Sequence, residues 1–278
     1  MIVIEDLRKS YGQAKALDGL SLRVLEGELF AFLGPNGAGK TTTIRILTGL
    51  TRLDSGIATI NGLNIEKEPL AVKRLCGLVP QQVNLDGELS VLENLDIHGR
   101  LFGLSRRERK EKAEEYLTYV EMLDRAHNQV KTLSGGLKRR LTIARALIHS
   151  PKVLFLDEPT VGLDAAIRRR IWSLIKKISR SGVTVFLTTH YIEEAEFLAT
   201  NVAFIDSGKL LAIDSPKAII DELGQWAVDV YEGEGTKTFF FGDRIEASDK
   251  ISQHPGSGSI RRVNLEDAFL AKTGKRVD

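Results

Sequence analysis

Continuous apolar runs of strand length alternate with amphipathic helical patterns along this chain. The helical patterns cover residues 164–180 and 192–199. The apolar runs are LFAFL (29–33), VLFLDE (153–158), VTVFLTTH (183–190) and VAFID (202–206). Because strands that alternate with helices form parallel sheets with helices on their faces, this pattern predicts an α/β fold with a parallel core sheet.

The first part of the chain is richer in strand patterns. Residues 2–4 and 20–25 alternate as strands around a turn-like segment, YGQAKALDG (11–19). IATING (57–62) and CGLVP (76–80) have the composition of further strands. We therefore expect a β-rich portion before about residue 88.

From about Ser90 the apolar positions fall at helical spacing, at 92, 95 and 101 and then at 113, 117, 120 and 123. Ser105 followed by Glu108 is the signature of a capping box. The last helix should end near Ser150, because Pro151 disfavours a helical residue before it. The pattern predicts an all-helical insert over about residues 88–150.

The composition shifts after Pro216. WAVDVYEGEGTKTFFFG (226–242) predicts two strands around a glycine turn, and LEDAFLAKTG (265–274) predicts a short helix. We therefore divide the chain into a large domain, 1–215, and a small α+β module, 216–278. No group of reactive side chains is evident in the module, so we favour a structural or regulatory role for it.

The charge balance implies no strongly acidic or basic partner. The 278 residues have a formal net charge of +2, with 42% hydrophobic and 27% charged residues, which is ordinary for a soluble globular protein. Three basic runs lie in predicted helices, and we favour solvated helix faces over a nucleic-acid groove for them, so no nucleic acid is expected. These runs are Arg106-Arg107, Lys138-Arg139-Arg140 and Arg168-Arg169-Arg170.

Cysteine usage and hydropathy bear on the compartment. Cys76 is the single cysteine, so no disulfide within the chain is possible, which fits a reducing compartment. The first residues, MIVIEDLRKSYG, lack the apolar region of a signal peptide. No apolar run approaches the roughly 18 residues of a membrane span. We expect a protein that is soluble by itself and reaches a membrane only through a partner.

A glycine-rich loop follows the first buried strand and opens a helical pattern. The loop fits G-x-x-x-x-G-K-[ST], in which backbone N–H groups and the helix N-terminus cradle phosphates. We expect Lys40 to reach the β- and γ-phosphates and the Thr41 hydroxyl to ligate magnesium; Thr42 follows directly. The loop residues are Gly34, Pro35, Asn36, Gly37, Ala38, Gly39, Lys40 and Thr41.

Three polar residues at strand ends are candidates for metal binding and catalysis. Asp157 and Glu158 end one buried strand, and His190 closes the next. With a phosphate loop in the same chain, Asp157 is interpreted as a magnesium partner and Glu158 as the group that polarises an attacking water. A lone histidine is usually structural, but His190 ends a strand expected in the same crevice, where it could contact the γ-phosphate.

A second possible phosphate site lies 94 residues after the glycine-rich loop. Ser134, Gly135 and Gly136 stand directly before a long helical pattern. Ser134 is an N-cap candidate, and the two glycines leave the first N–H groups of the helix open to approach. The chain already has a complete phosphate loop, so the presence of this second set of residues requires an explanation.

Together these residues resemble the ATP-binding cassette (ABC) ATPases, the nucleotide-binding subunits of ABC transporters. The resemblance covers about residues 1–215. GPNGAGKT resembles the Walker A motif, VLFLDE the Walker B motif, and LSGG (133–136) the family signature. The resemblance also implies an adenine-stacking aromatic at Tyr11, the Q-loop glutamine at Gln81, the D-loop aspartate at Asp164 and the switch histidine at His190.

The resemblance implies a P-loop NTPase fold with an antiparallel β subdomain, and hydrolysis of ATP with Mg²⁺. Lys40, Gln81, Glu158 and His190 would be catalytic, with magnesium at Thr41, Gln81 and Asp157. Each ATP would lie between the P-loop of one cassette and the LSGG of a second, as in a homodimer. Such subunits act in the cytoplasm, on the inner face of the cell membrane, through a separate integral-membrane permease.

The motifs LSGGLKRRLTIARAL, LFLDEPTVGLD and LTTHYIEEAE are most similar to exporters that pair this subunit with a separate permease. Leu137 departs from the family, which commonly has glutamine there. Two alternatives differ in class. Soluble ABC ATPases of DNA repair or translation usually carry tandem cassettes, coiled coils or zinc modules, none of which is evident. A P-loop kinase or GTPase would leave LSGG unexplained.

Overall fold

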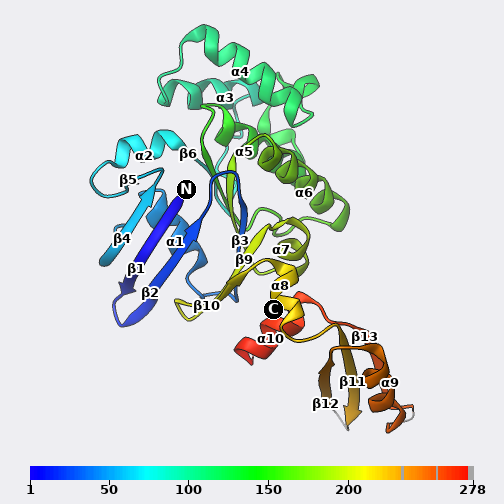
Figure 1. Cartoon of the computed structure of the whole chain (residues 1–278). Helices are drawn as coiled ribbons and strands as arrows, with labels where there is room; N and C mark the ends of the chain where they lie inside the picture. The colour runs from blue at the N-terminus through cyan, green and yellow to red at the C-terminus, as the bar shows by residue number, and fades with distance from the viewer. Residues whose placement is uncertain (233–234, 255, 275–278) are drawn as a thin grey trace.

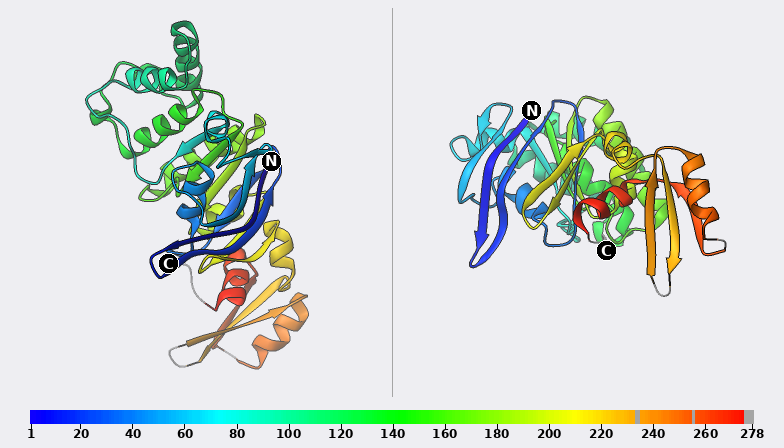
Figure 2. Two further views of the ribbon diagram at one scale, coloured as in Figure 1. Left: turned by 90° about the vertical axis from the view of Figure 1, so that its left-hand side faces the viewer. Right: turned by 60° about the horizontal axis from the view of Figure 1, so that its bottom comes forward.

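The computed structural model describes residues 1–232, 235–254 and 256–274. A six-stranded sheet lies at the centre of the molecule, flanked by an antiparallel sheet, a helical subdomain and a small three-stranded sheet (Figures 1 and 2). This arrangement confirms the predicted α/β class with a parallel core sheet and a helical insert.

The central sheet is parallel except at one edge, where β10 runs antiparallel to β9. Every residue of β3, β7 and β8 is buried. Because the carboxyl ends of parallel strands share one edge, the residues after these strands are brought together. In hydrogen-bonded order the strands are β10 (Lys209–Asp214), β9 (Asn201–Asp206), β3 (Leu29–Leu33), β8 (Thr184–Thr189), β7 (Val153–Asp157) and β6 (Cys76–Val79).

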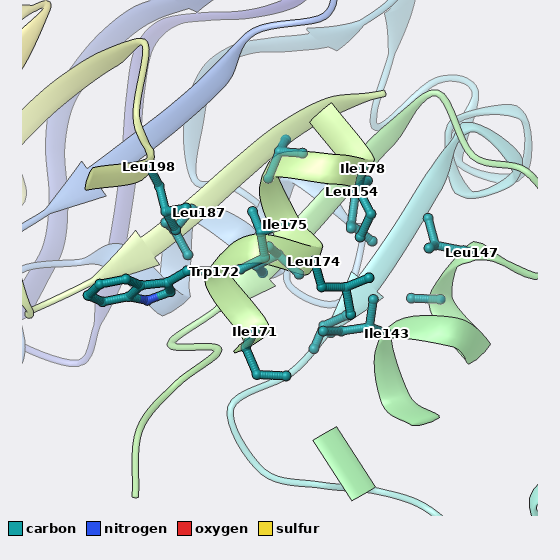
Figure 3. Close-up of a cluster of buried hydrophobic side chains, with 14 of the residues drawn as sticks. Ile143, Leu147, Leu154, Ile171, Trp172, Leu174, Ile175, Ile178, Leu187 and Leu198 are labelled. Atoms are coloured by element: carbon teal, nitrogen blue, oxygen red, sulfur yellow. The ribbon is translucent and has the colours of Figure 1, made fainter. Parts of the chain in front are cut away.

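Helices pack against both faces of the central sheet. One face carries α1 (Lys40–Leu47), which packs in a cluster with the phenylalanines of β3, β7 and β8. On the other face α6 (Ala165–Arg180) directs Ile171, Ile175 and Ile178 inward, and these side chains share a cluster with Leu154 and Leu187 of the sheet (Figure 3). Burial of each such side chain contributes about 1.5–3 kcal/mol, so this apolar stripe fixes α6 on the sheet.

The antiparallel sheet differs from the expectation in its first hairpin. The prediction of a turn over residues 11–19 is wrong, because most of these residues lie in a strand. β1 (Ile2–Tyr11) pairs with β2 (Ala14–Val24). Register shifts along this pair interrupt the alternation of apolar residues, so the period of two survives only at the strand ends. The sheet is completed by β4 (Ser55–Ile60) and β5 (Leu63–Asn64), followed by α2 (Pro69–Leu75).

The insert contains helices α3 (Val91–Leu101), α4 (Arg106–Tyr119) and α5 (Gly135–Leu147), with short 3₁₀ turns between α4 and α5. The capping box at Ser105 is confirmed, because the Glu108 N–H donates to Ser105 Oγ and the Ser105 N–H donates to Glu108 Oε2. An equivalent box, not predicted, starts α3 at Ser90. α5 ends before Ser150, as expected.

The C-terminal segment contains a small sheet and helices that attach it to the core. The predicted strands β11 (Trp226–Glu232) and β12 (Gly235–Phe241) are antiparallel, and their glycine turn lies outside the described residues. The elements not predicted are β13 (Gly258–Arg262), α8 (Pro216–Asp221) and α9 (Arg244–Ser252).

The buried apolar side chains of two helices of this segment pack with the core and not with the small sheet. Ile219 of α8 and Phe269 of α10 (Leu265–Thr273) belong to the same cluster as α6 and the central sheet, and the Phe269 ring lies 5.2 Å from that of Phe204. The small sheet packs around its own cluster of Val228, Val230 and Ala247. The segment from β11 to β13 therefore has an apolar cluster of its own, and the ion pair between Arg261 and Asp267 joins it to α10.

No helix within residues 1–232, 235–254 and 256–274 is both long enough and apolar enough to span a bilayer.

Candidate functional site

The glycine-rich loop connects β3 to α1 and is shaped by close backbone contacts. A Cβ atom on Gly34 would clash with the Ile205 carbonyl oxygen, and one on Gly39 would lie 2.5 Å from that of Ala16. Gly39 has φ +108°, a left-handed conformation that favours glycine. The unpredicted length of β2 thus matters here, because β2 brings Ala16 against the loop.

The loop and the start of α1 fit an anionic group. Gly37 has φ +82° and open space on the side where a Cβ would point. No side chain of the described residues caps α1, and its first turn holds no acidic residue, so its first N–H groups remain available. Lys40 is 5% exposed and donates to the carbonyl oxygens of Gly34 at 2.7 Å and Pro35 at 3.2 Å.

Asp157 lies beside the hydroxyl that follows the lysine. Thr41 Oγ1 donates to Asp157 Oδ1 at 3.2 Å, and Thr188 Oγ1 donates to the same oxygen at 2.6 Å. Thr188 of β8 was not predicted as a site residue. A hydroxyl and a carboxylate at this distance are hard oxygen donors of the kind that Mg²⁺ prefers, so these residues fit a magnesium ion.

Glu158 is the centre of the arrangement. Its side chain is 4% exposed, with Oε1 3.1 Å from Lys40 Nζ and Oε2 2.6 Å from His190 Nδ1. Its backbone is left-handed, with φ +49°, and its N–H donates to the Thr188 carbonyl at 3.1 Å. Residues from the ends of β7 and β8 and from the start of α1 therefore meet at one carboxylate, as the parallel topology predicts.

A cavity of about 150 Å³ opens at this point. Tyr11 does not line it: this side chain is 51% exposed, with Lys9 Nζ 5.5 Å from the ring centroid. Gly34 and Pro35 also lie outside the lining. The lining residues are Ala16, Asn36, Gly37, Ala38, Gly39, Lys40, Thr41, Thr42, Gln81 and Glu158.

The second glycine site lies away from this cavity. Ser134 is the N-cap of α5, as predicted, and its Oγ accepts from the Leu137 N–H at 3.4 Å. Ser134 and Gly135 are exposed, whereas Gly136 is buried against α6, where a Cβ would lie 2.7 Å from Ile167 Cγ2. Asp164 caps α6 in the same way, accepting from the Ile167 N–H at 2.9 Å.

The three basic runs were predicted to lie on solvated helix faces, and this prediction is wrong for Arg139, which is buried. Arg139 is 3% exposed, and its guanidinium donates to backbone carbonyls after β6 and β7. Burial lowers its pKa to about 10. The acceptors are the carbonyl oxygens of Pro80 (2.5 Å), Gln81 (3.5 Å), Asp157 (3.1 Å), Glu158 (3.0 Å) and Pro159 (2.6 Å).

Glu194 of α7 (Ile192–Leu198) is a second buried charge that the sequence did not single out. Its Oε1 accepts from Thr160 Oγ1 and Trp172 Nε1, both at 2.8 Å. Burial raises the pKa of this carboxyl group. The only sequence signal was its place four residues before Leu198, on the apolar side of a short helix.

Comparisons with known proteins agree on one family. The family described as ABC transporter matches residues 17–161. A Nod factor export ATP-binding protein I from Cupriavidus metallidurans is 41% identical over 100% of this chain and 98% of its own length. A daunorubicin resistance ATP-binding protein from Streptomyces coeruleorubidus is 42% identical over 99% of this chain and 95% of its own length.

A solved structure has the same fold. It is the dimeric post-hydrolysis state of an ATP-binding cassette bound to ADP and phosphate. The TM-score is 0.70 at 30% sequence identity, over 77% of this chain and 98% of that one.

Proposed function

Because this chain belongs to the ABC transporter family, we propose that it is the ATP-binding and ATP-hydrolysing subunit of an exporter, in which two cassettes close on ATP and drive a separate permease. ATP binding and hydrolysis follow from the family; the direction of transport and the role of each residue are the proposal. The observation that supports it most is Glu158, a buried carboxylate held between Lys40 and His190 at the mouth of the phosphate loop.

The phosphates of ATP would bind in the cavity formed by the loop Gly34–Thr41 and by Thr42. The open side of Gly37 and the uncapped N-terminus of α1 support this placement. Lys40 would exchange its present carbonyl and Glu158 partners for β- and γ-phosphate oxygens. Tyr11 would stack on the adenine ring, and its exposure leaves a ring face available for that contact.

Glu158 would act as the general base. When Lys40 turns to the phosphates, Glu158 Oε1 becomes free to accept a proton from water, while Oε2 keeps its contact with His190. With both ring nitrogens protonated, His190 would donate from Nδ1 to Glu158 Oε2 and from Nε2 to a γ-phosphate oxygen. A positioned base of this kind contributes about 10²–10⁴-fold to the rate.

Magnesium would be held by Thr41 and Asp157, whose side chains are already in contact. When bound, the ion neutralises charge on the phosphates and aligns them for attack. Gln81 lines the same cavity and would contact the metal and the water. Thr188 keeps Asp157 oriented toward Thr41 through its 2.6 Å bond.

A second cassette would complete the site. Ser134, Gly135 and Asp164 are exposed and do not line the cavity of their own chain. Two chains packed face to face would each present these residues to the nucleotide of the other, as in a homodimer. The helix N-terminus capped by Ser134 would then receive the γ-phosphate.

The permease partner and the direction of transport are proposed from the relatives. Proteins named for Nod factor export and for daunorubicin resistance align over nearly the whole chain. We therefore place this subunit in the cytoplasm, on the inner face of the membrane, bound to integral-membrane permease subunits and not to nucleic acid. Purification with a polytopic membrane protein would support this placement.

The substitution Glu158→Gln tests the proposed reaction. It removes the base but keeps the shape of the site, so we expect hydrolysis to fall by about 10²–10⁴-fold. ATP should then accumulate in a stable dimer, which light scattering would detect with ATP and not with ADP. The exposed residue Glu193 in α7 provides a matched control, since Glu193→Gln should change neither measurement. Hydrolysis at the wild-type rate in Glu158→Gln would contradict the assigned role.

A further inference from the structure

Arg139 connects two parts of the site that the proposed function assigns to different nucleotides. We propose that Arg139 is a positioning residue: it ties the phosphate-binding end of α5 to the backbone of Glu158 and Gln81 in its own chain, and thereby couples the two ATP sites of the dimer. The inference rests on the proposed function, because only in a face-to-face dimer does α5 serve the partner's nucleotide.

The guanidinium of Arg139 is engaged through each of its three nitrogens. Its Nε and Nη2 groups donate to the three consecutive carbonyls of residues 157–159, and Nη1 reaches those of residues 80 and 81. A guanidinium has five N–H groups in a rigid planar fork, whereas a lysine ammonium has three donors around one atom. Lysine at this position could keep the charge but not all of these contacts.

The contacts fall on the backbone that directs the catalytic carboxylate. Glu158 has φ +49°, a conformation that costs energy in a non-glycine residue and persists where neighbouring contacts over-determine it. Here the Glu158 N–H is bound by Thr188, and the carbonyls on both sides of its Cα are bound by Arg139 Nη2. Arg139 therefore stabilises the turn that points Glu158 toward Lys40 and His190.

The same helix begins at the exposed phosphate-binding end. Arg139 lies five residues after Ser134, about 7–8 Å along the helix axis. Gly136 packs directly on Ile167, and because such close packing transmits displacement, we expect α6 to shift with the start of α5. A displacement of Ser134 by a partner's phosphate would reach Glu158 and Gln81 through the Arg139 fork. Burial lowers the Arg139 pKa only to about 10, so the group stays charged at neutral pH.

The experiment compares Arg139→Lys, and Arg139→Met as an uncharged second variant, with Arg140→Lys as the control. Arg140 is adjacent in α5, but its guanidinium donates to the Val120 carbonyl and to exposed Glu121, away from the cavity. Each variant is measured for ADP affinity, for the Hill coefficient and kcat of ATP hydrolysis, and for ATP-dependent dimerisation in the Glu158→Gln background.

We expect both Arg139 variants to bind ADP within about twofold of the parent and to form the ATP dimer, with kcat reduced at least tenfold and the Hill coefficient lowered toward 1. Arg140→Lys should match the parent. Unchanged kcat and Hill coefficient would overturn the proposal, and so would loss of the folded dimer in both Arg139 variants, which would mean a purely structural role. Absence of a dimer in Glu158→Gln alone would instead contradict the proposed function.

Discussion

Two helices of this protein have a glycine at or next to their first residue, yet their N-termini are built differently. At α1 the N-cap is left-handed Gly39 without a side-chain cap, and it is followed by buried Lys40. At α5 the N-cap is Ser134 in an extended conformation, whose own hydroxyl binds the Leu137 N–H. The first site lies in a cavity with Glu158, while Ser134 and Gly135 lie on the surface.

The difference indicates which of the two sites is complete. At the α1 site one carboxylate contacts a lysine and a histidine, and the neighbouring carboxylate accepts from two hydroxyls. The α5 site offers only a capped helix dipole and exposed backbone, which attract an anion but cannot by themselves catalyse its reaction. This supports the proposal that the α5 end is half of a site, which the nucleotide of another chain would complete.

The largest effect is expected when the cation of the complete site is removed. Lys40→Met should weaken ATP binding by about 10–150-fold, because a hydrogen bond to a charged group contributes about 1.5–3 kcal/mol. Hydrolysis should become undetectable, and a fluorescent ATP analogue would report the affinity. The matched control is Lys152→Met at an exposed position. Unchanged affinity in Lys40→Met would remove the basis for treating α1 as the primary site.

A mixture of two inactive chains would test whether the α1 site of one chain works with the α5 end of another. Ser134→Glu places a negative charge at the α5 end, so it should abolish ATP-driven dimerisation but leave ADP affinity unchanged. Mixed with an equal amount of Lys40→Met chain, it should restore hydrolysis to at most about half of the wild-type rate, because each mixed dimer has one of its two composite sites intact.

Each chain alone provides the baseline for that mixture. A chain that carries both substitutions, mixed with an equal amount of Lys40→Met chain, is the matched control, because it forms no intact composite site. No recovery in the first mixture, with both chains folded, would mean that the P-loop and the LSGG act within one chain.

The smallest effect concerns Leu137, the departure within the signature. A glutamine there could complete a capping box with Ser134, but Leu137 already packs against the main core cluster. The lost apolar contact and the gained cap bond should nearly cancel, so Leu137→Gln should shift Tm by less than about 2 °C and leave hydrolysis unchanged. Calorimetry of both proteins would check this; a shift above about 4 °C would show that one contribution dominates.

Several parts of the fold could be predicted because their signals are local. The glycine loop and the apolar strands before Asp157 and His190 are encoded in neighbouring residues, and so are the caps at Ser105 and Ser134. The β1–β2 hairpin was mispredicted because its register shifts interrupt the period-two pattern. The helices α8 and α10 were assigned to the C-terminal module on composition, although their buried side chains pack with the core.

The sequence by itself determined the family and the chemical groups of the candidate site, since each motif specifies a backbone conformation and a side chain within a few residues. Only the tertiary structure decided that Arg139 is buried, that it donates to the backbone carbonyls of the turn at Glu158, and that Ser134 lies apart from the cavity. The acceptors of Arg139 are 18 to 59 residues away along the chain. A basic run has the same local pattern whether its guanidinium faces solvent or a set of carbonyls, and only the packing of α5 against the strand ends distinguishes the two.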